Sequence, residues 1–174
     1  LVKHGYRGPI FTNTATRDLC AVLLADSAHL QEEDARRANR YGSASHTPAL
    51  PLYTKADAAR AVQRISALPS GRGAEVGRVQ IAFTPVGHLL GASAITLTIG
   101  RERIVYSGDL GRSNDLLLPA PQAVRAADVL LIEATYGNRL HPKEDVQTRL
   151  GDIIRRTIAR GGSVLLPSFA VGRA

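Results

Sequence analysis

Two short stretches near the middle of the chain alternate apolar and polar side chains, which is the pattern of half-buried β-strands, and a third short stretch is apolar throughout. They cover residues 79–83, 95–99 and 104–106. Because consecutive strands with short connections usually pair as neighbours, we predict that these three stretches lie side by side in one sheet.

Two later stretches are apolar without alternation, which favours strands that are covered on both faces. They are Asp128–Glu133, which is charged only at its two ends, and Ser163–Pro167. Between them, Pro142 can open a helix, Gly161 and Gly162 can end it, and apolar residues recur at helical spacing. These residues are Val146, Leu150, Ile153, Ile154 and Ile158. The pattern therefore predicts a strand, a helix and a second strand.

The first third of the chain carries mainly helical patterns. Thr14 or Thr16 can cap a helix that runs to about Ala25, and a second, highly charged helical run covers residues 27–39. Thr54–Asp57 resembles a capping box that opens a third helix. Its apolar stripe consists of Ala58, Ala61, Val62 and Ile65. Helices, then strand hairpins, then a strand-helix-strand unit predict a layered α/β domain.

The composition agrees with a globular domain. Of the 174 residues, 44% are hydrophobic, which is enough for a core. The sequence has no apolar run of membrane-spanning length and no basic-then-apolar leader. Its single cysteine, Cys20, excludes an internal disulfide and a cysteine-built zinc site. From these features we expect a cytoplasmic protein without a membrane segment.

The charge balance is strongly basic, with 22 lysine and arginine residues against 15 aspartate and glutamate residues and a net charge of +7. Nearly all of the positive charge is arginine, whose planar guanidinium suits phosphate groups. The charge therefore favours a polyanionic partner such as nucleic acid. A codon bias that enriches arginine and alanine together would give the same composition, and this alternative stays open.

Two turns place a metal-binding side chain directly after a predicted strand. His88 stands in Thr84-Pro-Val-Gly-His-Leu-Leu-Gly-Ala-Ser93, and Asp109 stands in Tyr106-Ser-Gly-Asp-Leu-Gly-Arg112. The neighbouring glycines let the backbone approach a ligand closely, and adjacent strands can carry both side chains to one edge of a sheet. An imidazole and a carboxylate suit zinc or a similar divalent ion. On spacing alone, a capped loop histidine and a turn-forming aspartate remain open interpretations.

Several motifs together resemble the metallo-β-lactamase fold nucleases of the β-CASP group. This group includes bacterial RNA-processing exonucleases and the nuclease subunit of the eukaryotic pre-mRNA cleavage and polyadenylation machinery. The matching pieces follow in order along nearly the whole chain. They are Gly5-Tyr-Arg-Gly-Pro-Ile-Phe-Thr-Asn-Thr-Ala-Thr-Arg-Asp-Leu19, the turns with His88 and Asp109, Ile132-Glu-Ala-Thr-Tyr-Gly-Asn138, and Leu166-Pro-Ser-Phe-Ala-Val-Gly-Arg-Ala174.

The resemblance implies a fold, a metal centre and a reaction. The fold would be a partial αββα sandwich with a dinuclear zinc site at one sheet edge. His88 would bind one zinc ion, and Asp109 would bind as the ligand that bridges both. The implied reaction is hydrolysis of RNA phosphodiester bonds, with water as the nucleophile and the two ions clamping the phosphate.

The resemblance also implies roles for residues around the metal centre. Glu133 would lie near the site and orient a histidine rather than bind metal, so we count it with Asp109 as catalytic. The alternative is a strand-end carboxylate that caps the next turn. Arg112, Arg139 and Arg173 lie beside the matched motifs and are candidates for phosphate contacts, with plain solvation as the alternative.

The chain departs from the family at both ends. The family's principal metal motif, His-x-His-x-Asp-His, does not occur, and His4, His29, His46 and His141 lack its spacing. The resemblance therefore implies a partial metallo-β-lactamase domain over residues 1–162 and the start of the β-CASP region over residues 163–174. We expect a fragment that binds zinc poorly and does not cleave RNA by itself, from a protein that does.

Three functions compete for this sequence. The first is a zinc-dependent RNA exo- or endonuclease, as the intact protein. The second is a non-catalytic nucleic-acid-binding module with the same fold and a basic surface. The third is a metallo-β-lactamase hydrolase of small esters, which the terminal Phe-Ala-Val-Gly-Arg-Ala disfavours. A domain separated from a larger protein often exposes apolar surface that self-associates, so a homo-oligomer is a further expectation.

Overall fold

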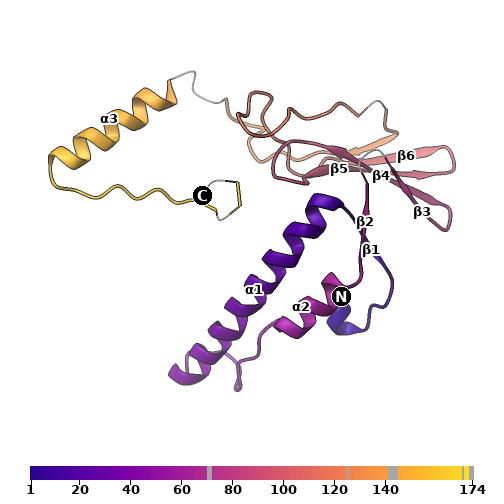
Figure 1. The fold of residues 1–174 in the computed structure, drawn as a ribbon, viewed down its shortest axis with the longest axis horizontal. Coiled ribbons are helices and arrows are strands. Elements are labelled where there is room, and N and C mark those ends of the chain that lie inside the picture. Colours follow the sequence, from indigo (N-terminus) through magenta and orange to yellow (C-terminus); the bar gives the residue numbers. More distant parts are fainter. Residues whose placement is uncertain (70–71, 125, 141–144, 170, 173–174) are drawn as a thin grey trace. The chain divides into compact units, whose positions relative to one another are not determined.

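Both candidate turns follow strands of a five-stranded sheet, which is the larger of the two sheets that the described residues form (Figure 1). The structure is a computed structural model that describes residues 1–69, 72–124, 126–140, 145–169 and 171–172. The chain forms two compact units, Leu1–Ile132 and Glu133–Ala174. The predicted domain boundary between residues 162 and 163 is a different division, and it stays a prediction.

The first unit begins with a small parallel sheet of two strands. β1 (Ile10–Asn13) pairs with β2 (Ile65–Leu68), with Ile10 opposite Ile65 and Asn13 opposite Leu68. The helical pattern had assigned Ile65 to the stripe of the third helix, and this prediction is wrong. The helix ends earlier, and Ile65 faces a β-branched partner across the sheet, where such residues pack well.

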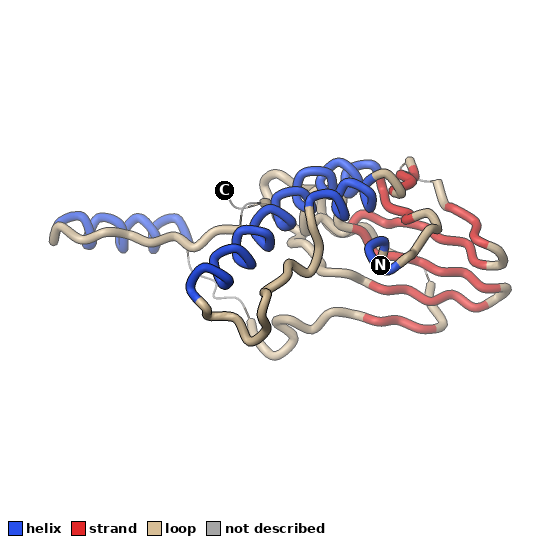
Figure 2. Tube along the Cα trace, turned by 90° about the horizontal axis from the view of Figure 1, so that it is seen from below, coloured by secondary structure: helices blue, strands red, loops and turns tan. Residues whose placement is uncertain are grey.

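Two helices connect β1 and β2 and lie side by side (Figures 1 and 2). They are α1 (Thr14–Tyr41) and α2 (Lys55–Val62), with Ala28 and Ala58 as their buried alanines. The capping box at the start of α2 is confirmed in both of its hydrogen bonds. A short 3-10 turn, η1 (Val2–His4), packs against α2.

α1 is one continuous helix, whereas the sequence pattern predicted two. Neither glycine nor proline separates the apolar run that ends near Ala25 from the charged run that follows, so nothing interrupts the helix. Its cap also differs from the prediction. Asn13, rather than Thr14 or Thr16, is the N-cap, and its Oδ1 accepts a hydrogen bond from the Thr16 backbone at 2.8 Å.

The larger sheet follows α2, and its strands are hydrogen-bonded to one another in the order of the sequence. Neighbouring strands are antiparallel except for the last pair, which is parallel. The three stretches predicted as neighbouring strands are confirmed as the central strands of this sheet, while the first strand was not predicted. The strands are β3 (Ala74–Val76), β4 (Val79–Pro85), β5 (Ser93–Ile99), β6 (Glu102–Tyr106) and β7 (Val129–Leu131).

The buried core of this unit lies directly behind the two candidate turns. Val86, Ala94 and Val105 are almost fully buried, and Ala92 and Val124 pack against them. Val86 lies between the end of β4 and His88. Val105 lies near the end of β6, four residues before Asp109. Packing of these apolar side chains therefore fixes where both turns start.

β7 differs from the prediction of a strand covered on both faces. It is shorter than Asp128–Glu133, and Val129, Leu130 and Leu131 are 51%, 57% and 49% exposed. β7 stands at the end of the strand order, with β6 as its neighbour in the sheet. An apolar run thus identified the strand correctly but not its position at an edge.

The second unit contains α3 (Val146–Ala159), as the apolar spacing predicted. Asp145 caps it by accepting hydrogen bonds from the Gln147 and Thr148 backbone at 3.0 and 3.4 Å, while Pro142 lies outside the described residues. The predicted strand over 163–167 is wrong. This stretch is extended without a strand partner among the described residues, and Leu165 is 89% exposed.

The described residues form a mixed α/β structure, as the sequence predicted. The finer prediction, an αββα sandwich, is not decided by these elements. Among the described residues, no helix combines the length and the apolar character needed to cross a bilayer.

Candidate functional site

The turn that carries His88 follows β4 and is closed by its own backbone. The Val86 amide donates to the Ala92 carbonyl at 3.0 Å, and the Ala92 amide donates to the Leu89 carbonyl at 2.9 Å. Val86 is buried, whereas the His88 side chain is exposed. The turn therefore anchors its base in the core and presents the imidazole to solvent.

The turn that carries Asp109 follows β6 and is held from two sides. The Ser107 amide donates to the Leu131 carbonyl at 2.9 Å, and the Gly111 amide donates to the Val86 carbonyl at 2.8 Å. Asp109 lies between these two anchors and is exposed. Its carboxylate is thus available to a ligand while the backbone around it is fixed.

The two turns touch each other through glycines. An ideal Cβ placed on Gly111 would lie 2.0 Å from the Gly87 carbonyl oxygen and 2.6 Å from the His88 amide nitrogen. Both distances are shorter than any real Cβ contact, so a side chain at Gly111 would push the turns apart. Close packing of glycine against backbone therefore brings the His88 and Asp109 turns together at one edge of the sheet.

A third segment closes over the first turn. The Gln122 amide donates to the Pro85 carbonyl at 3.0 Å, and a Cβ on Gly87 would meet the Pro119 carbonyl oxygen at 2.0 Å. Gly87 also has a φ of +64°, which side-chain-bearing residues rarely adopt. We refer to residues 86–92, 107–111 and 118–122 together as the loop edge.

The start of α1 is bonded to the loop edge as well. Asn13 Nδ2 donates to the Gly91 carbonyl at 2.5 Å and to Ser93 Oγ at 3.1 Å, and Thr16 Oγ1 donates to the same carbonyl at 3.1 Å. The residue that caps α1 thus also fixes the His88 turn. The sequence pattern missed this link because its partners are more than seventy positions apart along the chain.

Asp115 orders the chain between Asp109 and Pro119. Its Oδ1 accepts hydrogen bonds from the Leu117 and Leu118 amides at 2.8 and 2.9 Å. These amides, together with the charge of Arg112, hold the pKa of the Asp115 carboxyl below its usual range. The sequence pattern did not predict this turn. Aspartate is nevertheless known to form turns, because its side chain can accept a hydrogen bond from the backbone amide two residues further along the chain.

His88 and Asp109 have the right chemistry for binding a divalent metal, but two side chains are too few ligands for a metal site. Imidazole and carboxylate are zinc ligands, and both side chains are exposed at contacting turns. A protein zinc site needs at least three protein ligands. Within the described ranges, no group of three or more histidine, cysteine, aspartate or glutamate side chains is close enough to hold an ion. The loop edge is therefore an incomplete donor set as far as it is described.

The other candidate residues have less definite surroundings. Glu133 is half-buried, and its Oε2 accepts a hydrogen bond from the Thr135 backbone at 3.4 Å, which agrees with the turn-capping interpretation. Arg112 and Arg139 are exposed. Arg173 lies outside the described residues. Within the first unit, the structure thus brings His88 and Asp109 into neighbouring turns.

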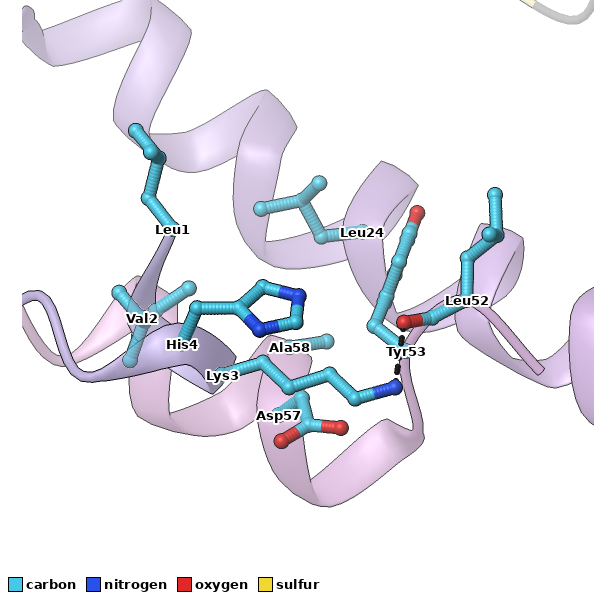
Figure 3. Close-up of a pocket in the computed structure, with 10 residues that line it drawn as sticks. Leu1, Val2, Lys3, His4, Leu24, Leu52, Tyr53, Asp57 and Ala58 are labelled. Carbon is cyan, nitrogen blue, oxygen red and sulfur yellow. Dashed lines mark hydrogen bonds between the residues drawn. The ribbon is translucent and has the colours of Figure 1, made fainter. Parts of the chain in front are cut away.

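Titratable side chains also gather at a cavity of about 250 Å³ beside η1, α1 and α2 (Figure 3). Lys3 Nζ donates to the Leu52 carbonyl at 2.6 Å, and Asp57 pairs with Arg60. The amide and then the hydroxyl of Thr54 hold the pKa of the Asp57 carboxyl below its usual range. Because these polar groups already serve the local structure, we assign the cavity no chemistry.

Comparison with known proteins gives relatives that align with the whole chain. It is 32% identical over 175 residues to a ribonuclease of Thermus thermophilus, 33% over 181 residues to transcription termination factor FttA of Lokiarchaeum, and 29% over 176 residues to cleavage and polyadenylation specificity factor 73 of Drosophila melanogaster. Each alignment covers 100% of this chain but only 37%, 26% and 24% of the respective relative. No protein-family model matches.

Proposed function

The chain belongs to the metallo-β-lactamase fold nucleases of the β-CASP group, and from this membership we propose that the protein hydrolyses RNA phosphodiester bonds in a metal-dependent reaction. The names of its relatives, a ribonuclease among them, support RNA as the substrate class. The observation that carries the proposal is the loop edge. There, an imidazole and a carboxylate stand exposed on two turns that touch through Gly87 and Gly111.

We propose zinc as the metal, with two ions bound per protein. His88 would supply a neutral nitrogen to one ion, and Asp109 would supply two oxygens that can bridge both. Bound zinc would act as a Lewis acid toward the phosphate group. The buried core behind both turns and the hydrogen bonds at their bases would keep the two donors in place without a metal.

Further parts of the proposal concern the surroundings of this site. Glu133 would be a positioning residue that orients a histidine ligand, and Arg112 and Arg139 would contact phosphates of the RNA. The complete fold would be an αββα sandwich, which the mixed sheet and its helices support in outline. We also retain the cytoplasm as the compartment, since the single Cys20 suits a reducing environment.

One observation favours a second candidate function, a non-catalytic nucleic-acid-binding module. Among the described residues, the loop edge offers two metal donors rather than three. A protein that kept this fold and its net charge of +7 could bind RNA without cleaving it. The two candidates differ in whether metal and cleavage depend on His88 and Asp109.

Cleavage of an end-labelled, single-stranded RNA by the intact, zinc-loaded protein tests the proposal. Replacing His88→Ala or Asp109→Ala removes a donor and is expected to lower the cleavage rate by about 100-fold or more. His46→Ala and Asp34→Ala, which remove the same groups from exposed sites elsewhere, are expected to cleave at the wild-type rate. Glu133→Gln is expected to keep its metal and cleave more slowly.

Two outcomes would decide between the candidates. If the wild type binds RNA but no metal enables cleavage, the binding module is the correct function. If cleavage occurs and is unaffected by both alanine variants at the loop edge, the nuclease site lies elsewhere and the role given to these residues is wrong.

A further inference from the structure

A second cavity, of about 240 Å³, opens beside the His88 turn. Gly87 and Leu89, the residues on either side of His88, both line it. The start of α1, the end of β2, the end of β4 and the segment before Gln122 supply most of the remaining walls. The lining residues are Asn13, Thr14, Ala15, Leu68, Pro69, Phe83, Pro85, Gly87, Leu89, Leu90, Gly91, Ala92, Ser93, Leu118 and Pro119. We refer to this cavity as the flanking pocket.

Among the described residues that line the flanking pocket, none has a charged side chain. Aliphatic residues, prolines and one aromatic ring, Phe83, make up most of it. Two of its polar side chains, Asn13 and Ser93, already bond to the Gly91 carbonyl. The Thr14 hydroxyl has no hydrogen-bond partner within the described ranges. The pocket therefore suits a neutral, largely apolar group with one polar edge, and it disfavours a phosphate or carboxylate.

The volume and position of the pocket further restrict the class of ligand that it can bind. Its volume is just below the range of about 300–1,000 Å³ that is usual for drug-sized ligands, so it suits one ring system rather than a whole nucleotide. It adjoins the turn where the proposed reaction holds a phosphate. In RNA, each phosphate is linked through a ribose to a nucleobase, which is neutral, flat and partly polar, and single-stranded RNA is often bound by its unstacked bases.

We propose that the flanking pocket receives one nucleobase of the RNA, next to the phosphate that His88 and Asp109 face. The inference rests on the proposed function. It adds a site at which the protein binds the RNA through one of its nucleobases. Phe83 and the prolines provide flat apolar surface for the base, and the Thr14 hydroxyl provides a hydrogen bond to its edge.

Equilibrium binding of short RNAs with a single abasic position tests this inference. Removing the base at each position in turn is expected to weaken binding to the intact protein by about tenfold at one position and by much less at the others. The RNA is otherwise unchanged, so its phosphates and their charge stay constant. Binding is measured by fluorescence anisotropy after chelation of metal, which prevents cleavage.

Two variants connect the effect to this pocket. Leu90→Ala removes part of the wall, and Ala15→Leu fills part of the space. Each is expected to reduce the abasic penalty at the sensitive position to about threefold or less. Leu30→Ala is the matched control, because Leu30 on α1 is 55% exposed and Leu90 is 59% exposed. It is expected to keep the full penalty.

The outcomes separate this inference from the proposed function. Equal binding of all abasic RNAs, or an unchanged penalty in both pocket variants, would overturn the pocket's role even if His88→Ala abolishes cleavage. A penalty that both variants reduce would support the pocket even if no metal enables cleavage. If the variants alter binding of a polypeptide but not of RNA, the pocket is a protein contact instead.

Discussion

Gly111 determines how closely the two candidate turns can approach each other. Its Cα faces the peptide group between Gly87 and His88, with no room for even a methyl group. The amide of the same residue donates to Val86, so the contact is fixed by a hydrogen bond as well as by shape. At the scale of single residues, the site therefore depends on glycines as much as on the proposed ligands.

We predict that Gly111→Ala separates the turns and destabilises the first unit by roughly 1–3 kcal/mol. The added methyl group would meet a backbone oxygen, which cannot rotate away as a side chain can. The urea concentration at the midpoint of unfolding and the affinity for zinc both measure the effect. We expect both values to be lower than in the wild type.

Gly100→Ala is the control for this substitution. Gly100 has a φ of +62° but open space around it, so alanine there adds backbone strain of about 1 kcal/mol without a clash. It is expected to leave zinc affinity unchanged. A Gly111→Ala protein with wild-type stability and zinc affinity would show that the contact between the turns is unimportant.

Among the elements, α2 depends on its N-terminal capping box. The Thr54 hydroxyl accepts a hydrogen bond from the Asp57 amide at 3.2 Å, and Asp57 Oδ2 accepts one from the Thr54 amide at 2.9 Å. With only eight residues, α2 has little intrinsic stability and needs these bonds and its packing against α1. Thr54→Ala is expected to cost about 1 kcal/mol.

The same capping box predicts a pH dependence of stability. Because the pKa of Asp57 is lowered in the folded state, its carboxylate stabilises the fold above the ordinary carboxyl pKa, and this contribution is lost as the pH falls through the lowered value. We predict that Asp57→Asn is less stable than wild type near neutral pH and that the difference narrows below about pH 4.

Denaturant unfolding at several pH values measures this difference. Asp34→Asn, at an exposed position of α1, controls for the general loss of a carboxylate. If the stability difference between wild type and Asp57→Asn stays constant from neutral to acidic pH, then the capping carboxylate does not contribute through its charge.

Local sequence patterns predicted the elements whose stability is mostly local. Alternation identified β4 and β5, a short apolar run identified β6, helical spacing identified α3, and a four-residue pattern identified the start of α2. The patterns failed for strands that form only because they pair with another segment of the chain. β2 (Ile65–Leu68) exists because β1 pairs with it across more than fifty residues, and β3 (Ala74–Val76) exists because β4 folds back on it. Neither stretch is long enough for its own period to be recognised.

The candidate site was predictable in its chemistry and not in its construction. The glycine-flanked turns were visible in the sequence, and so were His88 and Asp109. The bonds from Asn13 to Gly91 and the approach of Pro119 to Gly87 join segments that are distant in sequence. No local pattern reports such contacts, because a polar residue that caps a helix looks the same whether or not it also binds a loop.

At the scale of the whole molecule, the chain combines a strongly basic composition with a donor set that its described residues leave incomplete. It spans less than two fifths of each of the three relatives named above. Metal binding is therefore the property that tests the proposed function most strictly. In the proposed function, metal binding depends on His88 and Asp109 of the loop edge together with further donors.

Zinc content per protein molecule, measured by elemental analysis after dialysis against trace zinc, is the decisive test of whether His88 and Asp109 bind metal. For the intact protein we predict about two ions, with both lost in Asp109→Ala and one lost in His88→Ala, while His46→Ala and Asp34→Ala keep the wild-type content. An unchanged zinc content in both loop-edge variants would contradict the assignment of His88 and Asp109 as metal ligands.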